Sequence, residues 1–297
     1  MEGVQPQGKE KPVVLVLVLA VLAISWASIF VRWCGAVPAS VIAFYRLFWS
    51  GFLMGAWALR SARGWPPELE GTGLIRHGGW LLVSGLMLAL HFASWIAAVQ
   101  TTTIAHALVL GSTHPVFTLL IAPHFLKESS RWQPRVAAVL TLAGVVLISG
   151  QDFFRAPPRL AGDLLAVVSA LFVSIYVQIA RRVRHQFSLR PYLFVVYGTA
   201  ALVLVVVNLG TGTPLVGYPP QAHFWMLMLA LIPTGVGHSL INWAARHLEA
   251  HKVNFAILGE PVIASLLAYW LFAEQPAGWF FPGAALILGG IALALSR

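Results

Sequence analysis

Long apolar runs recur along the whole sequence, and they restrict the folds that it can adopt. The first of them, "VVLVLVLAVLAISWASIFV", covers residues 13–31 and contains no charged side chain. About 20 residues of α-helix are needed to cross the apolar core of a lipid bilayer. Charged residues make up only 10% of the chain, whereas a typical soluble domain contains about 25%. The sequence therefore predicts an all-α integral membrane protein.

We expect ten transmembrane helices joined by short loops, preceded by a tail at residues 1–12. The first apolar run is too long for an ordinary signal peptide, and many more runs follow it, so we expect it to be retained. Cys34 is the single cysteine, which excludes an intrachain disulfide and a cysteine metal cluster. The helices are expected at residues 13–32, 39–60, 79–99, 103–126, 134–150, 160–181, 191–209, 222–245, 250–273 and 278–296.

The positive charges indicate how these helices are oriented. Membrane proteins carry an excess of Lys and Arg in their cytoplasmic loops. With the N-terminus inside, 15 Lys and Arg residues lie in cytoplasmic segments, three lie in outer segments, and Arg46 lies within a span. This bias predicts a multi-pass protein of a bacterial-type cytoplasmic (inner) membrane, with both termini in the cytoplasm. It also accounts for the net charge of +9 without a nucleic-acid partner.

The second half of the chain repeats features of the first half. Pro115 aligns with Pro261 when "STHPVFTLLIAPHFLKE" is laid over "LGEPVIASLLAYWLFAE", at an offset of 146 residues. An internal repeat of this kind indicates a duplicated structural unit. Three further matches have the same or nearly the same offset: Ser28 with Ser174, Leu140 with Leu286, and His91 with His238.

A duplicated unit of five helices has a consequence for membrane insertion. We expect a first repeat over residues 13–150, a linker over 151–159 and a second repeat over 160–297. Because five is an odd number, the second repeat inserts in the opposite orientation. Transporters built from inverted repeats bind their substrates near the bilayer midplane, between the repeats. The sequence therefore predicts two inverted five-helix repeats around a central cavity.

Several motifs of this chain occur together in one known family. They are "ISWASIFVRWCGAVPASVIAFYRLFWSG", the two proline-to-glutamate stretches quoted above, and "LAGDLLAVVSALFVSIYVQIARR". In this order the chain resembles the EamA-type transporters of the drug/metabolite transporter superfamily, with Arg46 at the place of the family's second-helix arginine. The resemblance implies a ten-helix secondary carrier, in most cases an exporter. The aromatic residues and His91 are most similar to the YddG branch, which exports aromatic and other amino acids.

Glu260 is the acidic residue expected deepest in the membrane. It lies ten residues after the start of the ninth expected helix, or about 15 Å at the helical rise of 1.5 Å per residue, which is halfway across the bilayer core. A charge at this depth costs about 2.5–3.5 kcal/mol on insertion scales. Glu260 is therefore either paired with a neighbouring helix or placed to bind a substrate amine or a proton. His114 is its counterpart in the first repeat.

Two pairs of side chains occupy equivalent places in the two repeats. His91 and Trp95 are four residues apart on the third expected helix, and His238 and Asn242 are four apart on the eighth, so each pair shares one helix face. They either bond between helices or line opposite walls of one cavity, together with flanking serines and aromatic rings able to stack on a ring or cation. The residues predicted to bind substrate are Trp26, Tyr45, His91, Ser94, Trp95, His114, Tyr176, His238, Ser239, Asn242 and Glu260.

A second group of residues is expected to have structural or gating roles. Pro115 and Pro261 each remove one helical hydrogen bond, which indicates either a packing kink or a cavity wall. Arg46 lies inside the second helix, where it either clamps neighbouring helices or holds a substrate carboxylate. Glu128 and Glu274 lie at the ends of their helices, near the membrane surface.

These features favour a secondary transporter that exports small metabolites by alternating access, with amino acids, including aromatic ones, as the expected substrates. The sequence has no ATP-binding GxxxxGK[ST] motif. One alternative is an exporter of lipophilic cations or drugs, which would suit the aromatic residues and Glu260. Another is an intramembrane metal-dependent enzyme, but the sequence has no HExxH motif. We therefore expect no enzymatic activity, no cofactor and no bound metal.

The expected partners are a small-molecule substrate and the lipid bilayer. We expect a monomer. Gly51 and Gly55 form a GxxxG pattern, which is typical of close helix packing, so a dimer is left open.

Overall fold

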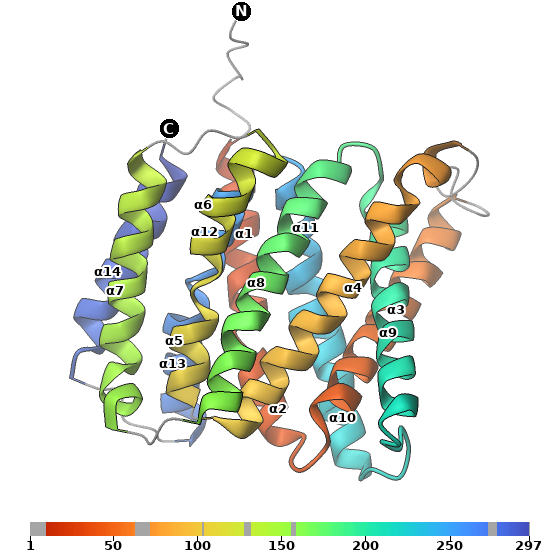
Figure 1. Ribbon diagram of the computed structural model, residues 1–297, viewed down its shortest axis with the longest axis horizontal. Helices are drawn as coiled ribbons and strands as arrows, with labels where there is room; N and C mark the ends of the chain where they lie inside the picture. Colours follow the sequence, from red (N-terminus) through yellow and green to blue (C-terminus); the bar gives the residue numbers. More distant parts are fainter. Residues whose placement is uncertain are drawn as a thin grey trace, which may run out of the picture.

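The computed structural model describes residues 10–62, 72–102, 104–127, 132–155, 159–272 and 278–296. All regular elements within these ranges are helices, which confirms the predicted all-α class. The helices form one bundle in which most of them run along a common direction (Figure 1). The elements are α1 (Glu10–Ile24), α2 (Ala27–Trp33), α3 (Ala39–Ala62), α4 (Thr72–Thr101), α5 (Ile104–Gly111), α6 (His114–Phe125), α7 (Trp132–Arg155), α8 (Leu160–Val183), α9 (Leu189–Gly210), α10 (Pro220–Leu229), the π-helix η2 (Ala230–His238), α11 (Ser239–Ala245), α12 (Ala250–Ile257), α13 (Glu260–Phe272) and α14 (Phe280–Leu295).

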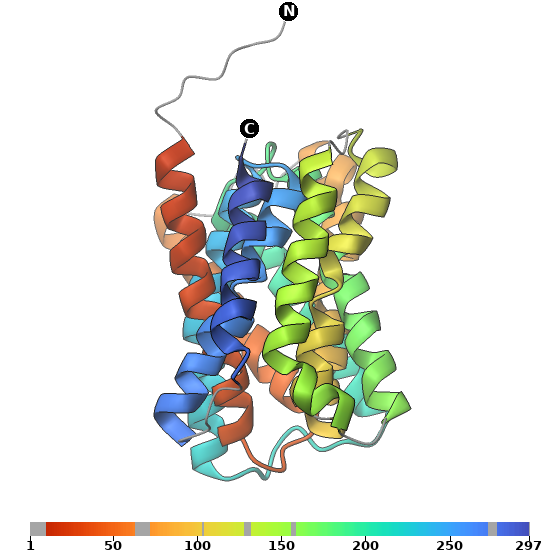
Figure 2. The ribbon, with the colours of Figure 1, turned by 90° about the vertical axis from the view of Figure 1, so that its left-hand side faces the viewer.

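The helices have the length and composition of membrane spans. Two shorter apolar helices, Trp132–Ile148 and Phe280–Leu295, pack side by side at one edge of the bundle (Figure 2). The sequence predicts ten spans, and length and hydropathy identify fewer than ten within the described ranges. Seven segments are long and apolar enough to cross a membrane: Val13–Trp33, Ala39–Arg60, Gly78–Thr101, Leu160–Val183, Leu189–Gly210, Pro220–Ala245 and Ala250–Phe272.

Three spans that the sequence predicts as single helices are broken. The first is divided into α1 and α2, the fourth into α5 and α6, and the ninth into α12 and α13. The last two breaks fall at residues 112–113 and 258–259, so that Pro115 and Pro261 become the second residues of α6 and α13. A proline is well tolerated there, because the first backbone N–H groups of a helix have no intrahelical partner. The chain therefore starts a new helix at each proline.

The fourth and ninth spans are broken at corresponding places. α5 starts at Ile104 and α12 starts at Ala250, while α6 starts at His114 and α13 starts at Glu260. Both pairs of positions differ by 146 residues, which is the offset found between the two halves of the sequence. The structure thus repeats this helix–break–helix unit with the spacing of the sequence repeat.

The eighth span contains a π-helix that the sequence pattern did not predict. It covers Ala230–His238 and includes Pro233, which cannot donate a backbone hydrogen bond. The hydroxyl of Thr234 donates to the carbonyl of Leu229, five residues earlier, at 3.1 Å. This wider turn places Thr234 and His238 on the inner side of the bundle, where both are buried.

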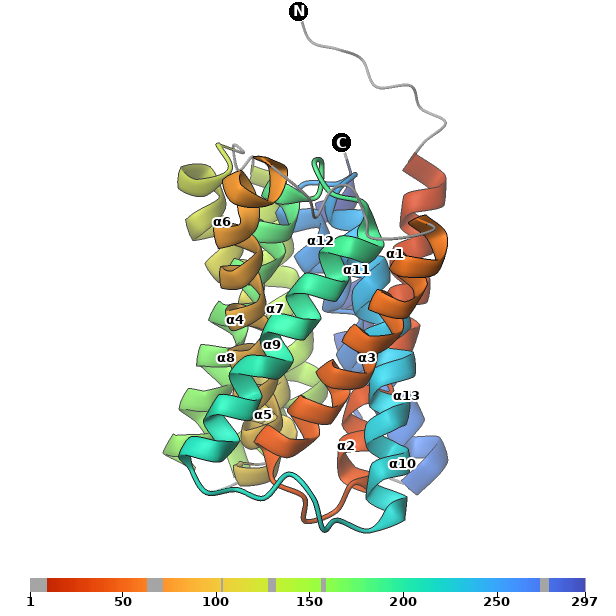
Figure 3. The same cartoon turned by 90° about the vertical axis from the view of Figure 1, so that its right-hand side faces the viewer.

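Glycines bring several helices into close contact. A Cβ atom on Gly144 of α7 would lie 2.5 Å from the carbonyl oxygen of Gly283 on α14. The GxxxG pattern of α3 packs in the same way against α9: a Cβ on Gly55 would lie 2.6 Å from the ring of Phe194. α3 and α9 run alongside each other on the face of the bundle seen in Figure 3. The pattern therefore serves packing within the chain.

Candidate substrate cavity

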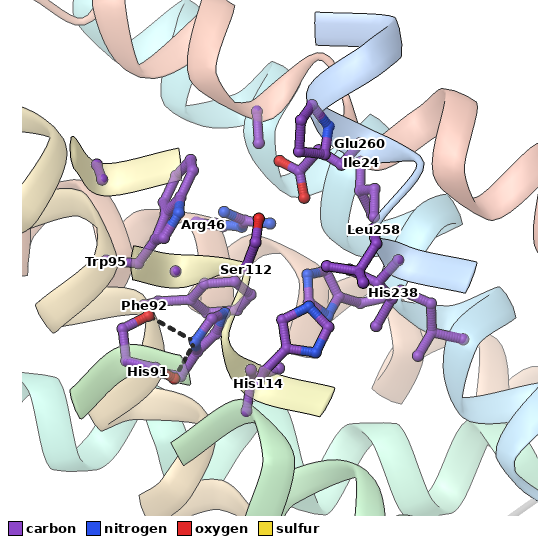
Figure 4. Close-up of a pocket in the computed structure, with 18 residues that line it drawn as sticks. Ile24, Arg46, His91, Phe92, Trp95, Ser112, His114, His238, Leu258 and Glu260 are labelled. Atoms are coloured by element: carbon purple, nitrogen blue, oxygen red, sulfur yellow. Dashed lines mark hydrogen bonds between the residues drawn. The ribbon is translucent and has the colours of Figure 1, made fainter. Parts of the chain in front are cut away.

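A cavity of about 690 Å³, counting its open side, lies where the broken helices meet (Figure 4). Ser112 and His114 line it at the α5–α6 break, and Leu258 and Glu260 line it at the α12–α13 break. The rest of its wall comes from α1, α2, α3, α4, α8, η2 and α11. The cavity is thus surrounded by residues from both halves of the sequence.

Opposite charges face each other at this cavity. Arg46 is only 1% exposed; its Nε donates a hydrogen bond to the hydroxyl of Thr234, and its guanidinium carbon lies 3.8 Å from the centre of the Phe92 ring. The Glu260 carboxylate is directed toward this guanidinium (Figure 4), and the two charges attract each other. Arg46 is therefore held by neighbouring helices, as one of the two sequence interpretations expected, and it also lines the cavity.

Three histidines line the same space, and they differ in their hydrogen bonds. His91 Nδ1 lies 3.0 Å from the carbonyl oxygen of Ser169, to which it donates, and 3.1 Å from the Ser169 hydroxyl. The Nδ1 atoms of His114 and His238 are buried and have no hydrogen-bond partner among the described residues. Figure 4 shows all three rings on the wall of this cavity.

Comparison with known proteins identifies the family. The profile of the EamA-like transporter family matches residues 11–150 and again residues 160–296. The chain belongs to the EamA-like transporter family. It is therefore a multi-pass membrane protein of a transporter family, as its helices indicate.

Known transporters are similar to this chain in sequence, and a solved structure has a similar fold. An uncharacterized transporter of Archaeoglobus fulgidus is 26% identical over 282 residues, 94% of each chain. An S-adenosylmethionine uptake transporter of Rickettsia bellii is 23% identical over 83% of this chain and 80% of its own. A crystal structure superposes with a TM-score of 0.79 over 96% of each chain, at 21% identity. These names do not support the expected aromatic amino-acid exporter branch.

Several residues that the sequence predicts for the site are brought together in this EamA-like protein. They share a place on the cavity wall although they come from five different helices. Depth in the membrane and repetition between the halves were the signals that selected them. The predicted residues that line the cavity are Arg46, His91, Trp95, His114, His238, Glu260 and Pro261.

Other predicted residues lie outside the cavity lining, where most contact other protein groups. Asn242 donates a hydrogen bond from Nδ2 to the hydroxyl of Tyr176. Tyr45 donates to the carbonyl of Leu215 at 2.9 Å, and the ring of Trp26 stacks on Phe30. Glu128 and Glu274 lie outside the described residues. The complete set that the structure places elsewhere is Trp26, Tyr45, Ser94, Pro115, Tyr176, Ser239 and Asn242.

The structure adds residues that the sequence did not single out. Phe92 and Thr234 hold the Arg46 guanidinium, and Ser169 holds the His91 ring. Ser112 lines the cavity two residues before His114, within the quoted "STHP" motif. Phe92, Thr234 and Ser169 take part through contacts between different helices, which no local sequence pattern indicates. Only Ser112, two residues before His114, could have been selected from its place in the sequence.

A buried network of hydroxyl and amide side chains lies one helical turn beyond His114. The hydroxyls of Thr118 and Ser174 are 2.8 Å apart, and Asn254 Nδ2 donates to the Thr118 hydroxyl at 2.9 Å. Gln178 Nε2 lies 3.3 Å from the Ser174 hydroxyl. We call these four residues the hydroxyl–amide network; it joins α6, α8 and α12.

A metal site receives no support from this geometry. Across the described ranges, no group of three or more His, Cys, Asp or Glu side chains is arranged to hold a metal ion. The cavity instead presents one cation, one anion, imidazoles and aromatic rings. Such a surface is suited to binding a polar organic molecule.

Proposed function

We propose that this EamA-like protein is a secondary transporter of small zwitterionic metabolites that carry an α-amino-acid group. The observation that carries the proposal is the presence of Arg46 and Glu260 at one buried cavity. A guanidinium matches the α-carboxylate of such a molecule, and a carboxylate matches its α-ammonium group. Amino acids and S-adenosylmethionine, the substrate in the names of the rickettsial relatives, all carry this group.

Charge balance explains why a zwitterion would be preferred. In the empty cavity Arg46 and Glu260 compensate each other. A zwitterion placed between them gives each protein charge a new partner and leaves the net charge of the cavity unchanged. A ligand with a single charge would compensate one residue and leave the other as an unpaired buried charge, which is costly in a low-dielectric site.

The surroundings of Arg46 support a binding role. Thr234 and Phe92 fix its Nε and its guanidinium face, so the remaining N–H donors are held in place before a substrate arrives. Such pre-organisation increases affinity, because less conformational freedom is lost on binding. The aromatic ring of Trp95, also on the cavity wall, would contact the substrate's side chain.

We further propose that transport occurs by alternating access of two inverted five-helix repeats, residues 13–150 and 160–297. The constant offset between the broken helices and the two matches of the family profile support this arrangement. Discontinuous helices at the membrane midplane are a recurring feature of secondary transporters. One chain surrounds the whole cavity, which favours a monomer as the working unit.

We propose a bacterial-type inner membrane as the location, with both termini in the cytoplasm and export as the direction. α1 begins and α14 ends at the same end of the bundle (Figure 2), and the Lys and Arg bias assigns that end to the cytoplasm. The rickettsial relatives are named for uptake. A secondary transporter is driven by the gradient of its substrate or of a coupled ion such as the proton, so one cavity is compatible with transport in either direction.

Reconstitution tests the function directly. Liposomes containing the purified protein are loaded with unlabelled phenylalanine, glutamine or S-adenosylmethionine, and counterflow of the same labelled compound is measured. Choline and lactate, which carry one charge each, are the matched controls. We expect counterflow of at least one zwitterion and none of either control. Counterflow of choline alone would favour the lipophilic-cation alternative, and its absence for every zwitterion would reject the proposal.

A further inference from the structure

Two imidazole nitrogens at the cavity have no hydrogen-bond partner. His114 is 5% exposed and His238 is 7% exposed, and Nδ1 of each lies unpartnered within the described part of the chain. The Asn254 side chain interacts with the His114 ring, whereas Nδ1 of His114 takes part in no hydrogen bond. Both rings line the same cavity (Figure 4).

The cavity wall on which these two histidines lie also contains apolar side chains. They include Ile241, Ile257 and Leu258, and the Phe92 ring lies edge-on to His238 at 4.9 Å between centroids. A buried polar atom left without a partner costs about 1–3 kcal/mol. His91, in contrast, is fully engaged by Ser169. Two of the three cavity histidines therefore retain hydrogen-bonding capacity for a ligand.

We propose that His114 and His238 form a second subsite, which binds a hydrogen-bonding group on the substrate's side chain. A neutral imidazole has one donor and one acceptor nitrogen. Two such rings on the wall of one cavity, each with an unpartnered Nδ1, complement a group that has both a donor and an acceptor, such as a carboxamide or a nitrogen-containing aromatic ring. The substrate class is then zwitterionic metabolites with a polar side-chain end, in preference to those with a hydrocarbon end.

This inference rests on the proposed function, because Arg46 and Glu260 bind the zwitterionic group common to all candidates. The histidine pair then discriminates among them. Sites built to hydrogen-bond a substrate reject analogues that lack the bonding group far more strongly than apolar pockets reject a missing methylene. We expect a preference of about tenfold or more for the polar member of a pair of similar size.

Ligand-dependent thermal stability of the purified full-length protein tests the preference. Glutamine is compared with methionine, and histidine with phenylalanine, by the concentration at which each raises the melting temperature by a fixed amount. We expect glutamine and histidine to act at about tenfold lower concentration than their partners. His114→Leu and His238→Leu should each reduce this difference, whereas His114→Gln, which retains hydrogen-bonding atoms, should preserve it.

His124→Leu provides the matched control, because His124 lies on the same helix α6 but is exposed. It should leave the preference unchanged. Equal stabilisation by both members of each pair would overturn the inference while leaving the proposed function intact. A preference that survives in both leucine variants would also overturn it. Stabilisation by none of the four amino acids would overturn the proposed function and the inference together.

Discussion

The two broken spans have the same geometry but different chemistry. α6 and α13 each begin at the cavity, each carry proline as their second residue, and begin 146 residues apart. The first residue is His114 in one and Glu260 in the other. A helix N-terminus carries a partial positive charge, which the Glu260 carboxylate compensates at α13. The duplicated architecture thus presents one compensated and one uncompensated helix terminus to the same space.

The features shared by the two broken spans form the framework of the cavity, whereas the features that differ set its charge. The prolines and the helix breaks occur twice, so they belong to the shared framework of both units. Glu260 and Arg46 occur once, so the charge pattern distinguishes the two walls and, under the proposed function, would give a bound zwitterion a single orientation. Its ammonium group would face Glu260, and its carboxylate would face Arg46 and the start of α6.

The largest effect is expected from Glu260→Gln, which removes the negative charge at the start of α13 and so one of the differences between the two broken spans. Losing one partner of a hydrogen-bonded charge pair costs about 2–5 kcal/mol of binding free energy, so zwitterion affinity should fall by roughly 30-fold or more. Counterflow of a labelled zwitterion measures this. Glu249→Gln is the control, because Glu249 lies outside the cavity lining and is 43% exposed. Unchanged counterflow in Glu260→Gln would reduce Glu260 to a structural role.

Arg46→Lys should have the next largest effect, because it keeps the charge but not its geometry. Lysine cannot contact Thr234 and the Phe92 ring as the planar guanidinium does. We expect the concentration for half-maximal counterflow to rise by about 10- to 100-fold. Arg190→Lys is the matched control, since Arg190 also contacts an aromatic ring, that of Trp57, away from the cavity. Equal effects of both changes would contradict a substrate-binding role for Arg46.

His114→Glu would make the two helix starts alike. The cavity would then carry two carboxylates against one guanidinium, so its preference should move from zwitterions toward amino acids with a cationic side chain. We expect the ratio of lysine to glutamine binding to rise about tenfold. The melting-temperature shift at matched ligand concentrations measures the ratio. No change in the ratio would mean that residue 114 does not contribute to the charge seen by the substrate.

The smallest effects are expected from Pro115→Ala and Pro261→Ala. Each proline lies in the first turn of its helix, where a backbone N–H would have no intrahelical acceptor. Its replacement should therefore change the free energy of unfolding by about 1 kcal/mol or less. The two changes should be similar to each other, because the two breaks have the same geometry. Melting temperatures of the purified variants provide the test. A large loss at one proline only would show that the two breaks are not equivalent.

The sequence predicted the helical membrane class and several of the polar residues that line the cavity, for physical reasons. Long apolar runs are required to cross a bilayer, and a charged group such as Glu260 is costly within such a run. The division into separate helices was not predicted, although Gly, Ser, Thr, His and Pro at 111–115 and Leu, Gly, Glu and Pro at 258–261 mark the breaks, because the apolar segments on both sides together have the length of one span. Ser94 was expected at the cavity because it flanks His91 and Trp95, but its hydroxyl donates to the carbonyl of Leu90, a common alternative for serine. The roles of Phe92 and Thr234 could not be predicted, because they arise from tertiary contacts with Arg46.

The hydroxyl–amide network affects the stability of the packing between α6, α8 and α12. Gln178 and Asn254 are buried, and the side-chain amide oxygen of each has no hydrogen-bond partner in the described ranges. Each such oxygen raises the free energy of this arrangement by about 1–3 kcal/mol, and water would satisfy both once α6, α8 and α12 separate. The two oxygens therefore reduce the free-energy difference between the packed arrangement and one in which these helices separate.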